Sequence, residues 1–217
     1  MKFVLSFSGG KDSILSLDRL IKNGHTPLGL FIMYNEEAGR SWFHGIDGPL
    51  LEKISESLKL PLLIYPTGGE AYHLAIRKAL EQAKAEGADA VAFGDIDVKE
   101  NREWCECQCD AAGIQGIFPL WNEAREKLVR EVVSRGYECV IKCVRNEDLP
   151  QSFLGRKIDE SVIGEMQALG VDPSGEGGEF HTVVLDGPLF SFPVPVDKRE
   201  IIDFGNISAI NIVVAEK

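Results

Sequence analysis

The residues best suited to chemistry lie near the start of the chain, in the segment Ser8–Ser13 (SGGKDS). A short apolar run, Met1–Phe7, precedes it, and a stretch with helical spacing, Ser13–Lys22, follows it. The two glycines leave no Cβ in the way of an anion, and the free N–H groups of a first helical turn attract negative charge. Lys11 adds a mobile positive charge, and the serines can donate hydroxyl hydrogen bonds. The segment therefore predicts a phosphate-binding loop.

Asp12 would repel a bare phosphate, so we expect it to act through Mg²⁺ or to hold the loop in shape. The plainer alternative is a polar turn in which Asp12 or Ser13 caps the following helix. The segment matches neither the Walker A pattern nor the dinucleotide pattern GxGxxG. A buried strand before it and a β–α alternation after it favour a nucleotide site over a simple helix cap.

Apolar runs and helical periods alternate along residues 1–121. After the first strand and helix, the pattern predicts strands at Pro27–Met33, Pro61–Tyr65, Asp89–Phe93 and Gly116–Pro119, and helices at Gly48–Leu60, Glu70–Glu86 and Val98–Ala112. Strands that alternate with helices imply right-handed crossovers and a parallel sheet covered on both faces. We therefore predict a Rossmann-like α/β domain over residues 1–121.

The character of the chain changes after Trp121. Residues 122–217 carry predicted helices at Glu123–Arg135 and Arg156–Leu169, and predicted strands at Cys139–Val144, Thr182–Leu185, Leu189–Phe192 and Ser208–Val214. Glycines and prolines separate these β-rich segments, as in a sheet with short connections. We predict a second, smaller α+β domain over residues 122–217.

Ligands of open parallel sheets bind at the carboxyl ends of the strands, which selects a second set of residues. Ser6 ends the first strand, and Phe31 and Met33, in the second, could contact adenine or simply belong to the core. Gly94 follows the fourth strand and, without a side chain, allows a ligand to approach the backbone closely. Asp95 could hold Mg²⁺ or a ribose, or cap the next helix.

Two loops carry further polar side chains. The loop Ser41–Ile46 over the second strand is interpreted as a lid, in which His44, next to Gly45, is an acid–base group, a phosphate donor or a structural histidine. In the second half, the segment Ser174–Thr182 (SGEGGEFHT) holds two carboxylates and an imidazole on flexible backbone. It is either a solvated acidic turn or a substrate pocket.

Composition excludes several classes of function. A formal net charge of −11 argues against a surface that neutralises a polynucleotide, and no apolar run reaches membrane-spanning length. Five cysteines without a secretion signal predict free thiols in a cytoplasmic protein. Cys105, Cys107 and Cys109 cannot all reach one metal from a helix, so we expect small core or boundary residues rather than ligands.

Four landmarks in order, SFSGGKDS, PLW at Pro119–Trp121, LGR at Leu154–Arg156 and GEGGEFHT, resemble the diphthine–ammonia ligase family of the PP-loop N-type ATP pyrophosphatases. The resemblance spans nearly the whole chain. It implies a PP-loop Rossmann-like domain, followed by a smaller family-specific domain. It also implies that ATP adenylates a carboxylate, that pyrophosphate leaves, and that free ammonia displaces AMP to form an amide.

The resemblance implies that Ser8–Ser13 grip the phosphates and that Glu176 and Glu179, with the glycines between them, line the acceptor side. Together with the residues selected above from strand ends and loops, they form three predicted sets. The catalytic set is Lys11, Asp12, Asp95 and Glu179. The ATP-binding set is Ser6, Ser8, Gly9, Gly10, Lys11, Asp12, Ser13, Phe31, Met33, Gly94 and Asp95, with Mg²⁺ on Asp12 and Asp95. The acceptor-binding set is His44, Gly45, Glu176, Gly177, Gly178, Glu179 and His181.

The acceptor itself stays open. Archaeal and eukaryotic ligases of this type usually have an acidic residue where this chain has His181, and the pairs His44-Gly45 and Gly94-Asp95 look more like bacterial relatives. The carboxylate then belongs either to a modified protein side chain or to a small molecule, for example in cobalamin metabolism. We also expect a homodimer as one possible assembly. The alternatives to the ligase are a tRNA-modifying or tRNA-thiolating PP-loop enzyme and a non-catalytic ATP-binding protein.

Overall fold

A computed structural model describes residues 1–68 and 71–215. The first half contains β1 (Lys2–Ser6), α1 (Lys11–Lys22), β2 (Thr26–Asn35), β3 (Arg40–Ser41), α2 (Gly48–Leu58), β4 (Leu62–Thr67), α3 (Tyr72–Ala85), β5 (Ala90–Ala92), α4 (Lys99–Ala112) and β6 (Gln115–Ile117). The second half contains α5 (Arg125–Ser134), β7 (Glu138–Arg145), a 3-10 turn (Gln151–Phe153), α6 (Glu160–Ala168), β8 (Phe180–Asp186), β9 (Val196–Asp203) and β10 (Ile207–Val214). Glu70, the predicted start of a helix, lies outside the described residues.

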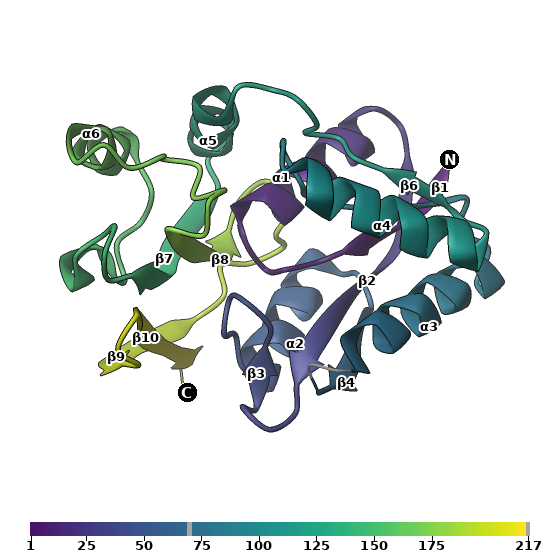
Figure 1. Ribbon diagram of the computed structural model, residues 1–217, viewed down its shortest axis with the longest axis horizontal. Helices are drawn as coiled ribbons and strands as arrows, with labels where there is room; N and C mark the ends of the chain where they lie inside the picture. Colours follow the sequence, from purple (N-terminus) through teal and green to yellow (C-terminus); the bar gives the residue numbers. More distant parts are fainter. Residues whose placement is uncertain (69–70, 216–217) are drawn as a thin grey trace.

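The first half is built on a six-stranded sheet in which β1 lies between β2 and β5. The pairings of β1 with β2, β2 with β4 and β5 with β6 are parallel, and only the short β3 runs antiparallel to β2. Phe3 and Leu5 of β1 belong to the core shared with α1 and α2, whereas Val4 between them belongs to the core shared with α3 and α4. This alternation confirms the predicted sheet with helices on both faces (Figure 1).

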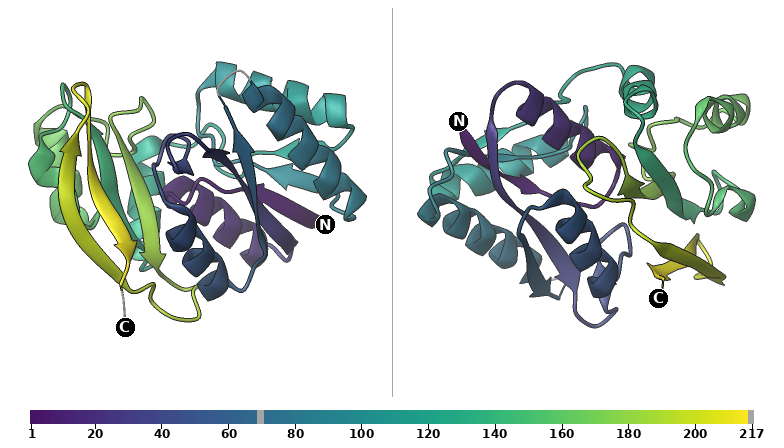
Figure 2. Two further views of the ribbon diagram at one scale, coloured as in Figure 1. Left: turned by 90° about the horizontal axis from the view of Figure 1, so that it is seen from below. Right: turned by 180° about the vertical axis from the view of Figure 1, so that it is seen from behind.

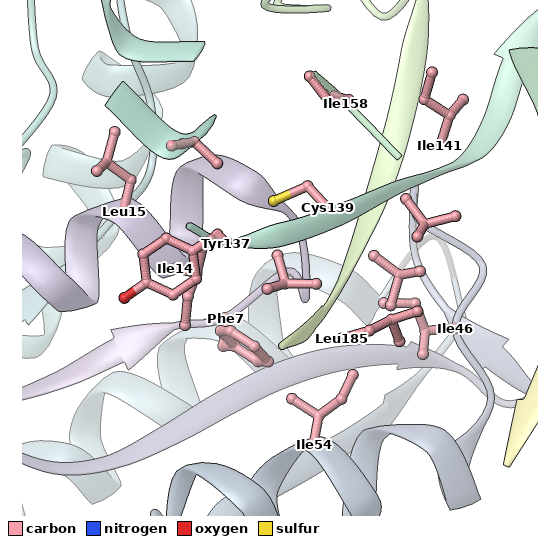
Figure 3. Packing of buried hydrophobic residues seen from close by; sticks show 14 of the residues in the cluster. Phe7, Ile14, Leu15, Ile46, Ile54, Tyr137, Cys139, Ile141, Ile158 and Leu185 are labelled. Carbon is pink, nitrogen blue, oxygen red and sulfur yellow. The ribbon is translucent and has the colours of Figure 1, made fainter. Parts of the chain in front are cut away.

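The second half forms a four-stranded antiparallel sheet in the order β8-β7-β10-β9. Figure 2 shows this sheet to one side of the parallel sheet, with the edge strand β9 facing away from it. One apolar cluster joins the halves: Phe7 and Ile14 pack with Tyr137, Cys139 and Leu185 (Figure 3). The predicted domain boundary after Trp121 falls between the two sheets. Because one apolar core extends through both halves, the division into two domains remains a prediction.

Two predictions in the second half were wrong. Leu189–Phe192 is a turn and not a strand, and the fourth strand of the sheet is β9 (VDKREIID). This strand is largely exposed on both faces, so its sequence shows neither a continuous apolar run nor alternation, and its backbone pairing with β10 defines it. The helix predicted from Arg156 begins at Glu160, because the Asp159 carboxylate accepts a hydrogen bond from the Val162 N–H (2.9 Å) and caps α6.

All five cysteines are free, as predicted, with Cys105 and Cys109 buried and Cys107 exposed. Across residues 1–68 and 71–215, no helix combines the length and apolar character needed to cross a membrane.

Candidate active site

The phosphate loop is a tightly packed turn between β1 and α1. Gly9 has a φ of +81°, and a Cβ there would lie 2.4 Å from Ile46 Cδ1. At Gly10, the N-cap of α1, a Cβ would lie 2.4 Å from His44 Cε1. Glycine is therefore required at both positions because the loop 41–46 packs directly against them. The positive φ of Gly9 is a second reason, since glycine adopts it without strain.

The side chains of the loop are fixed by one another. Lys11 is only 5% exposed; its ammonium lies 2.7 Å from the Asp12 carboxylate and 5.5 Å from the centre of the Phe180 ring. The Ser13 hydroxyl donates to the carbonyl oxygen of Gly10 (2.9 Å), and Ser8 donates to Ser13 (3.3 Å). Lys11 is thus held at the first turn of α1, where it adds its charge to the positive end of the helix.

The end of β5 approaches this turn closely. A Cβ on Gly94 would lie 3.1 Å from the backbone nitrogen of Ser13, so the two chain segments touch through a residue that has no side chain. Asp95 follows directly and is brought near Asp12. Burial raises the pKa of the Asp95 carboxyl, and the Asp12 carboxylate adds to the increase.

The second half contributes a carboxylate to the same place. Glu176 Oε1 accepts a hydrogen bond from the backbone N–H of Ile96 (3.2 Å), which ties the loop 174–182 to the end of β5. Burial, followed by repulsion from Asp12, raises the pKa of Glu176 to about 7. Glu176 is therefore a carboxyl group that can exchange a proton near neutral pH.

Strand β8 is hydrogen-bonded to the phosphate loop itself. The Lys11 N–H donates to the Thr182 hydroxyl oxygen (3.1 Å), and the Val184 N–H donates to the carbonyl oxygen of Gly9 (2.9 Å). Figure 1 shows β8 running beside the start of α1. No role for Thr182 was predicted from the sequence, in which its only signal is its position next to His181 at the end of the second-half loop.

Two histidines lie side by side between the loop 41–46 and β8. The rings of His44 and His181 have centroids 4.7 Å apart. Nδ1 of His44 lies 2.7 Å from the carbonyl oxygen of Thr182; a carbonyl only accepts, so this nitrogen carries the proton. Burial lowers the pKa of His44 to about 4 and that of His181 to about 3, so both rings are neutral at pH 7.

These groups surround one cavity of about 790 Å³, a size typical of small-molecule sites. The predicted site residues in its wall are Ser6, Ser8, Lys11, Asp12, Ser13, His44, Gly94, Asp95, Glu176, Gly178 and His181. They come from both halves of the chain, although the sequence showed them only as separate segments.

Other predicted site residues do not reach the cavity wall. Phe31 and Met33 are buried in the core under α3 and α4, where the Phe31 ring meets Tyr65 edge-on at 6.4 Å, so the predicted contact with adenine is not supported. Glu179 also lies off the cavity, and its Oε2 is buried without a hydrogen-bond partner in the described chain. The remaining predicted residues away from the wall are Gly9, Gly10, Gly45 and Gly177.

Four aromatic side chains form the rim of the cavity. Trp42, Phe43 and Trp104 surround Tyr72, with ring centroids 6.0, 6.5 and 6.0 Å from it. Phe43 is 69% exposed and has a φ of +64°, an unfavourable conformation for a bulky residue. The predicted lid loop supplies Trp42 and Phe43. The sequence offered no sign of Tyr72 and Trp104, because they reach the rim from two different helices.

The described residues include no cluster of three or more His, Cys, Asp or Glu side chains that could hold a metal alone. Asp12 and Asp95 both face the cavity, and Mg²⁺ is commonly held by one or two carboxylates together with phosphate oxygens. The donor set therefore fits a magnesium ion that binds together with a nucleotide.

Comparisons with known proteins agree with this architecture. The family model described as the diphthamide synthase N-terminal domain matches residues 1–116, and the model of the C-terminal domain of the same family matches residues 124–216. Proteins named diphthine–ammonia ligase are 26% identical to this chain in Homo sapiens and in Danio rerio, and the alignments cover 93% of this chain and 85% and 89% of theirs. One from Schizosaccharomyces pombe is 25% identical over 94% of this chain, which spans only 37% of that longer protein.

A solved structure from Methanocaldococcus jannaschii, described as a predicted subunit of tRNA methyltransferase, aligns with 86% of this chain and 98% of its own. Its sequence identity is 19% and its TM-score is 0.47, and a likeness at this level carries no argument about function.

Proposed function

Because the chain belongs to the diphthamide synthase family, we propose that it is an ATP-dependent carbon–nitrogen ligase of the diphthine–ammonia ligase type. In this reaction an oxygen of the acceptor carboxylate attacks the α-phosphorus of ATP, and pyrophosphate leaves. Ammonia then attacks the acyl carbon of the mixed anhydride, AMP leaves with its electron pair, and one proton is released. The observation that carries the proposal is that the phosphate loop and Glu176 line the same cavity.

The part of the cavity wall formed by Ser8, Lys11, Asp12, Ser13 and Thr182, called the floor from here on, suits the first step. Charge accumulates on the leaving pyrophosphate, and the first turn of α1, Lys11 and the serine hydroxyls are already in place to stabilise it. These groups need little rearrangement, because hydrogen bonds and close glycine packing hold them. Mg²⁺ on Asp12 and Asp95 would neutralise further negative charge on the phosphates.

Glu176 suits the second step. The nitrogen that attacks the anhydride must lose a proton, and a carboxylate with a pKa near 7 is matched to that transfer at neutral pH. We therefore assign the proton-accepting role to Glu176. Glu179, the second-half carboxylate in the predicted catalytic set, lies off the cavity wall.

Exchange of labelled pyrophosphate into ATP tests the proposal directly. The full chain is incubated with ATP, Mg²⁺ and one candidate carboxylate at a time, drawn from modified histidine derivatives and small metabolic acids. We expect exchange to depend on one class of carboxylate, and amide and AMP to appear when ammonium is added. Formation of ADP, or exchange that needs no carboxylate, would contradict the ligase assignment. The cytoplasmic location, the homodimer and the identity of the acceptor remain predictions.

A further inference from the structure

The Thr182 side chain has an unusual position for a strand residue. It lies on β8, an edge strand of the second half's sheet, paired in register with Ile141, yet its hydroxyl is at the start of α1 in the first half. The side chain is only 1% exposed to solvent, and it lines the cavity. A hydroxyl group can both accept and donate hydrogen bonds, and a buried hydroxyl is normally hydrogen-bonded.

Only the acceptor side is used here. The hydroxyl oxygen of Thr182 accepts the N–H of Lys11 at 3.1 Å, which supplies the cap that Gly10, without a side chain, cannot provide. Within residues 1–68 and 71–215, the hydroxyl hydrogen has no acceptor. Thus a donor that is almost completely buried remains unpaired in the wall of a cavity that we assign to phosphate groups.

The surroundings keep this hydroxyl in place. The carbonyl oxygen of Thr182 lies 2.7 Å from His44 Nδ1, and two residues along the strand the Val184 N–H donates to Gly9. A Cβ on Gly10 would lie 3.2 Å from the Thr182 hydroxyl oxygen. Three chain segments therefore converge on Thr182, and these contacts hold its hydroxyl at the cavity wall.

We propose that Thr182 is a phosphate-binding residue: its hydroxyl, held by the Lys11 N–H, donates a hydrogen bond to the pyrophosphate end of the nucleotide. The inference rests on the proposed function, because it takes the cavity floor to be the pyrophosphate site. The second half of the chain then does more than bind the acceptor. It completes the phosphate loop, and nucleotide binding requires both sheets.

The experiment compares three forms of the full chain: unaltered, Thr182→Val and Thr182→Ser. Calorimetry measures their affinities for inorganic pyrophosphate and for adenosine, each in the presence of Mg²⁺. Loss of a hydrogen bond to a charged ligand weakens binding by about 10- to 100-fold. We expect Thr182→Val to lose that much affinity for pyrophosphate and none for adenosine, and Thr182→Ser to stay within about threefold of the unaltered chain.

Ser208→Ala is the matched control. Ser208 is a buried hydroxyl on β10 of the same sheet, hydrogen-bonded to Gln151 (2.9 Å) and outside the cavity wall, so its loss should leave pyrophosphate affinity unchanged. If the Thr182 hydroxyl only caps α1, Thr182→Val will lower the melting temperature but bind pyrophosphate normally, and the inference is overturned. It is also overturned if Thr182→Ser is as weak as Thr182→Val. If Thr182→Val does not fold, Thr182→Ala takes its place in the same comparison.

The two proposals fail in different ways. If the unaltered chain binds no pyrophosphate, the proposed function fails and this inference fails with it. If the unaltered chain binds pyrophosphate and Thr182→Val binds it equally well, only the role of Thr182 is overturned.

Discussion

The floor and the rim of the cavity are built on opposite principles. On the floor, Lys11 and Thr182 are almost fully buried, glycines pack without clearance, and hydrogen bonds join β8 to the phosphate loop. On the rim, Phe43 and Trp104 are 69% and 37% exposed, and the aromatic rings meet edge-on or tilted. Rings in such contacts can shift, whereas the packed floor cannot.

The difference separates two tasks. A rigid array of donors suits the release of pyrophosphate from ATP, since preorganised charge stabilises the negative charge that develops on the leaving group. An exposed aromatic rim suits recognition of whatever enters the cavity. We infer that the floor sets the reaction and the rim sets the acceptor, a division that substitutions on either side can test, from the largest expected effect to the smallest.

Replacing Lys11 by methionine tests the floor most severely. The change removes the charge that lies over the Phe180 ring, and we expect turnover to fall by about 100- to 1000-fold in the pyrophosphate exchange assay. Lys22→Met is the control, because Lys22 pairs with Asp18 at the far end of α1 (3.0 Å) and should lose little activity. Turnover within about threefold of normal for Lys11→Met would contradict the assignment of the floor.

Gly10→Ala tests the packing of the floor. The added Cβ would lie 2.4 Å from His44, and such overpacking costs about 1–3 kcal/mol of stability. We expect a lower melting temperature and at least about tenfold weaker ATP binding. Gly164 in α6 is the matched site, because a Cβ there would meet no heavy atom within 4 Å, and Gly164→Ala should instead raise stability by about 0.5–1 kcal/mol. Equal effects at both glycines would mean that the packing argument is wrong.

The buried histidines predict sensitivity to acid. The pKa of His181 is lowered to about 3 in the folded state, from an ordinary value of 6.5. The contribution of the neutral ring to the free energy of unfolding is therefore fully present above pH 6.5 and is lost as pH falls toward 3. In that window the unfolded chain binds a proton that the folded chain does not. His181→Asn should therefore reduce the slope of unfolding free energy against pH by about 1.4 kcal/mol per pH unit. Chemical denaturation at about pH 4 to 7 measures it, and an unchanged slope would contradict a buried neutral His181.

Glu176 predicts a dependence of the opposite sign. Its pKa is raised to about 7 in the folded state, from an ordinary value of 4.5. The contribution of Glu176 to the free energy of unfolding is therefore complete below pH 4.5 and is lost as pH rises through 7. Glu176→Gln has no charge to bury, and its melting temperature relative to the unaltered chain should rise by about 2–4 °C between pH 5 and pH 8. A constant difference across that range would show that Glu176 is not desolvated.

Phe43→Ala tests the rim and should have the smallest effect. We expect KM for the acceptor to rise about three- to tenfold, while KM for ATP stays unchanged, because Phe43 lines the mouth and touches no part of the phosphate loop in our assignment. Phe204→Ala is the control, since Phe204 is also exposed (60%) but does not line this cavity. A rise in KM for ATP alone would assign the rim to the nucleotide and overturn the division of tasks.

Local patterns predicted much of the first half. The strand, glycine turn and helix that form the phosphate loop are contiguous, so their residue types and spacing are visible in the sequence. For Phe31 and Met33 the sequence left adenine contact and core packing both open, because position along a strand does not reveal which face a side chain occupies; both side chains are buried in the core. The sequence placed Glu179 in the catalytic set and Glu176 in the acceptor-binding set without a means to distinguish them: in a glycine-rich loop, backbone torsions decide which carboxylate faces the cavity.

The sequence by itself determined the class of fold, the phosphate loop and the family, because each rests on short contiguous motifs or on periodicity that can be read along the chain. The tertiary structure alone decided that β8 caps α1, that His44 and His181 lie side by side, and that four aromatic residues share one rim. Thr182 and Lys11 are 171 residues apart, and no periodicity connects them. Their contact exists because one continuous apolar core packs the two sheets together, and that packing is a property of the whole chain.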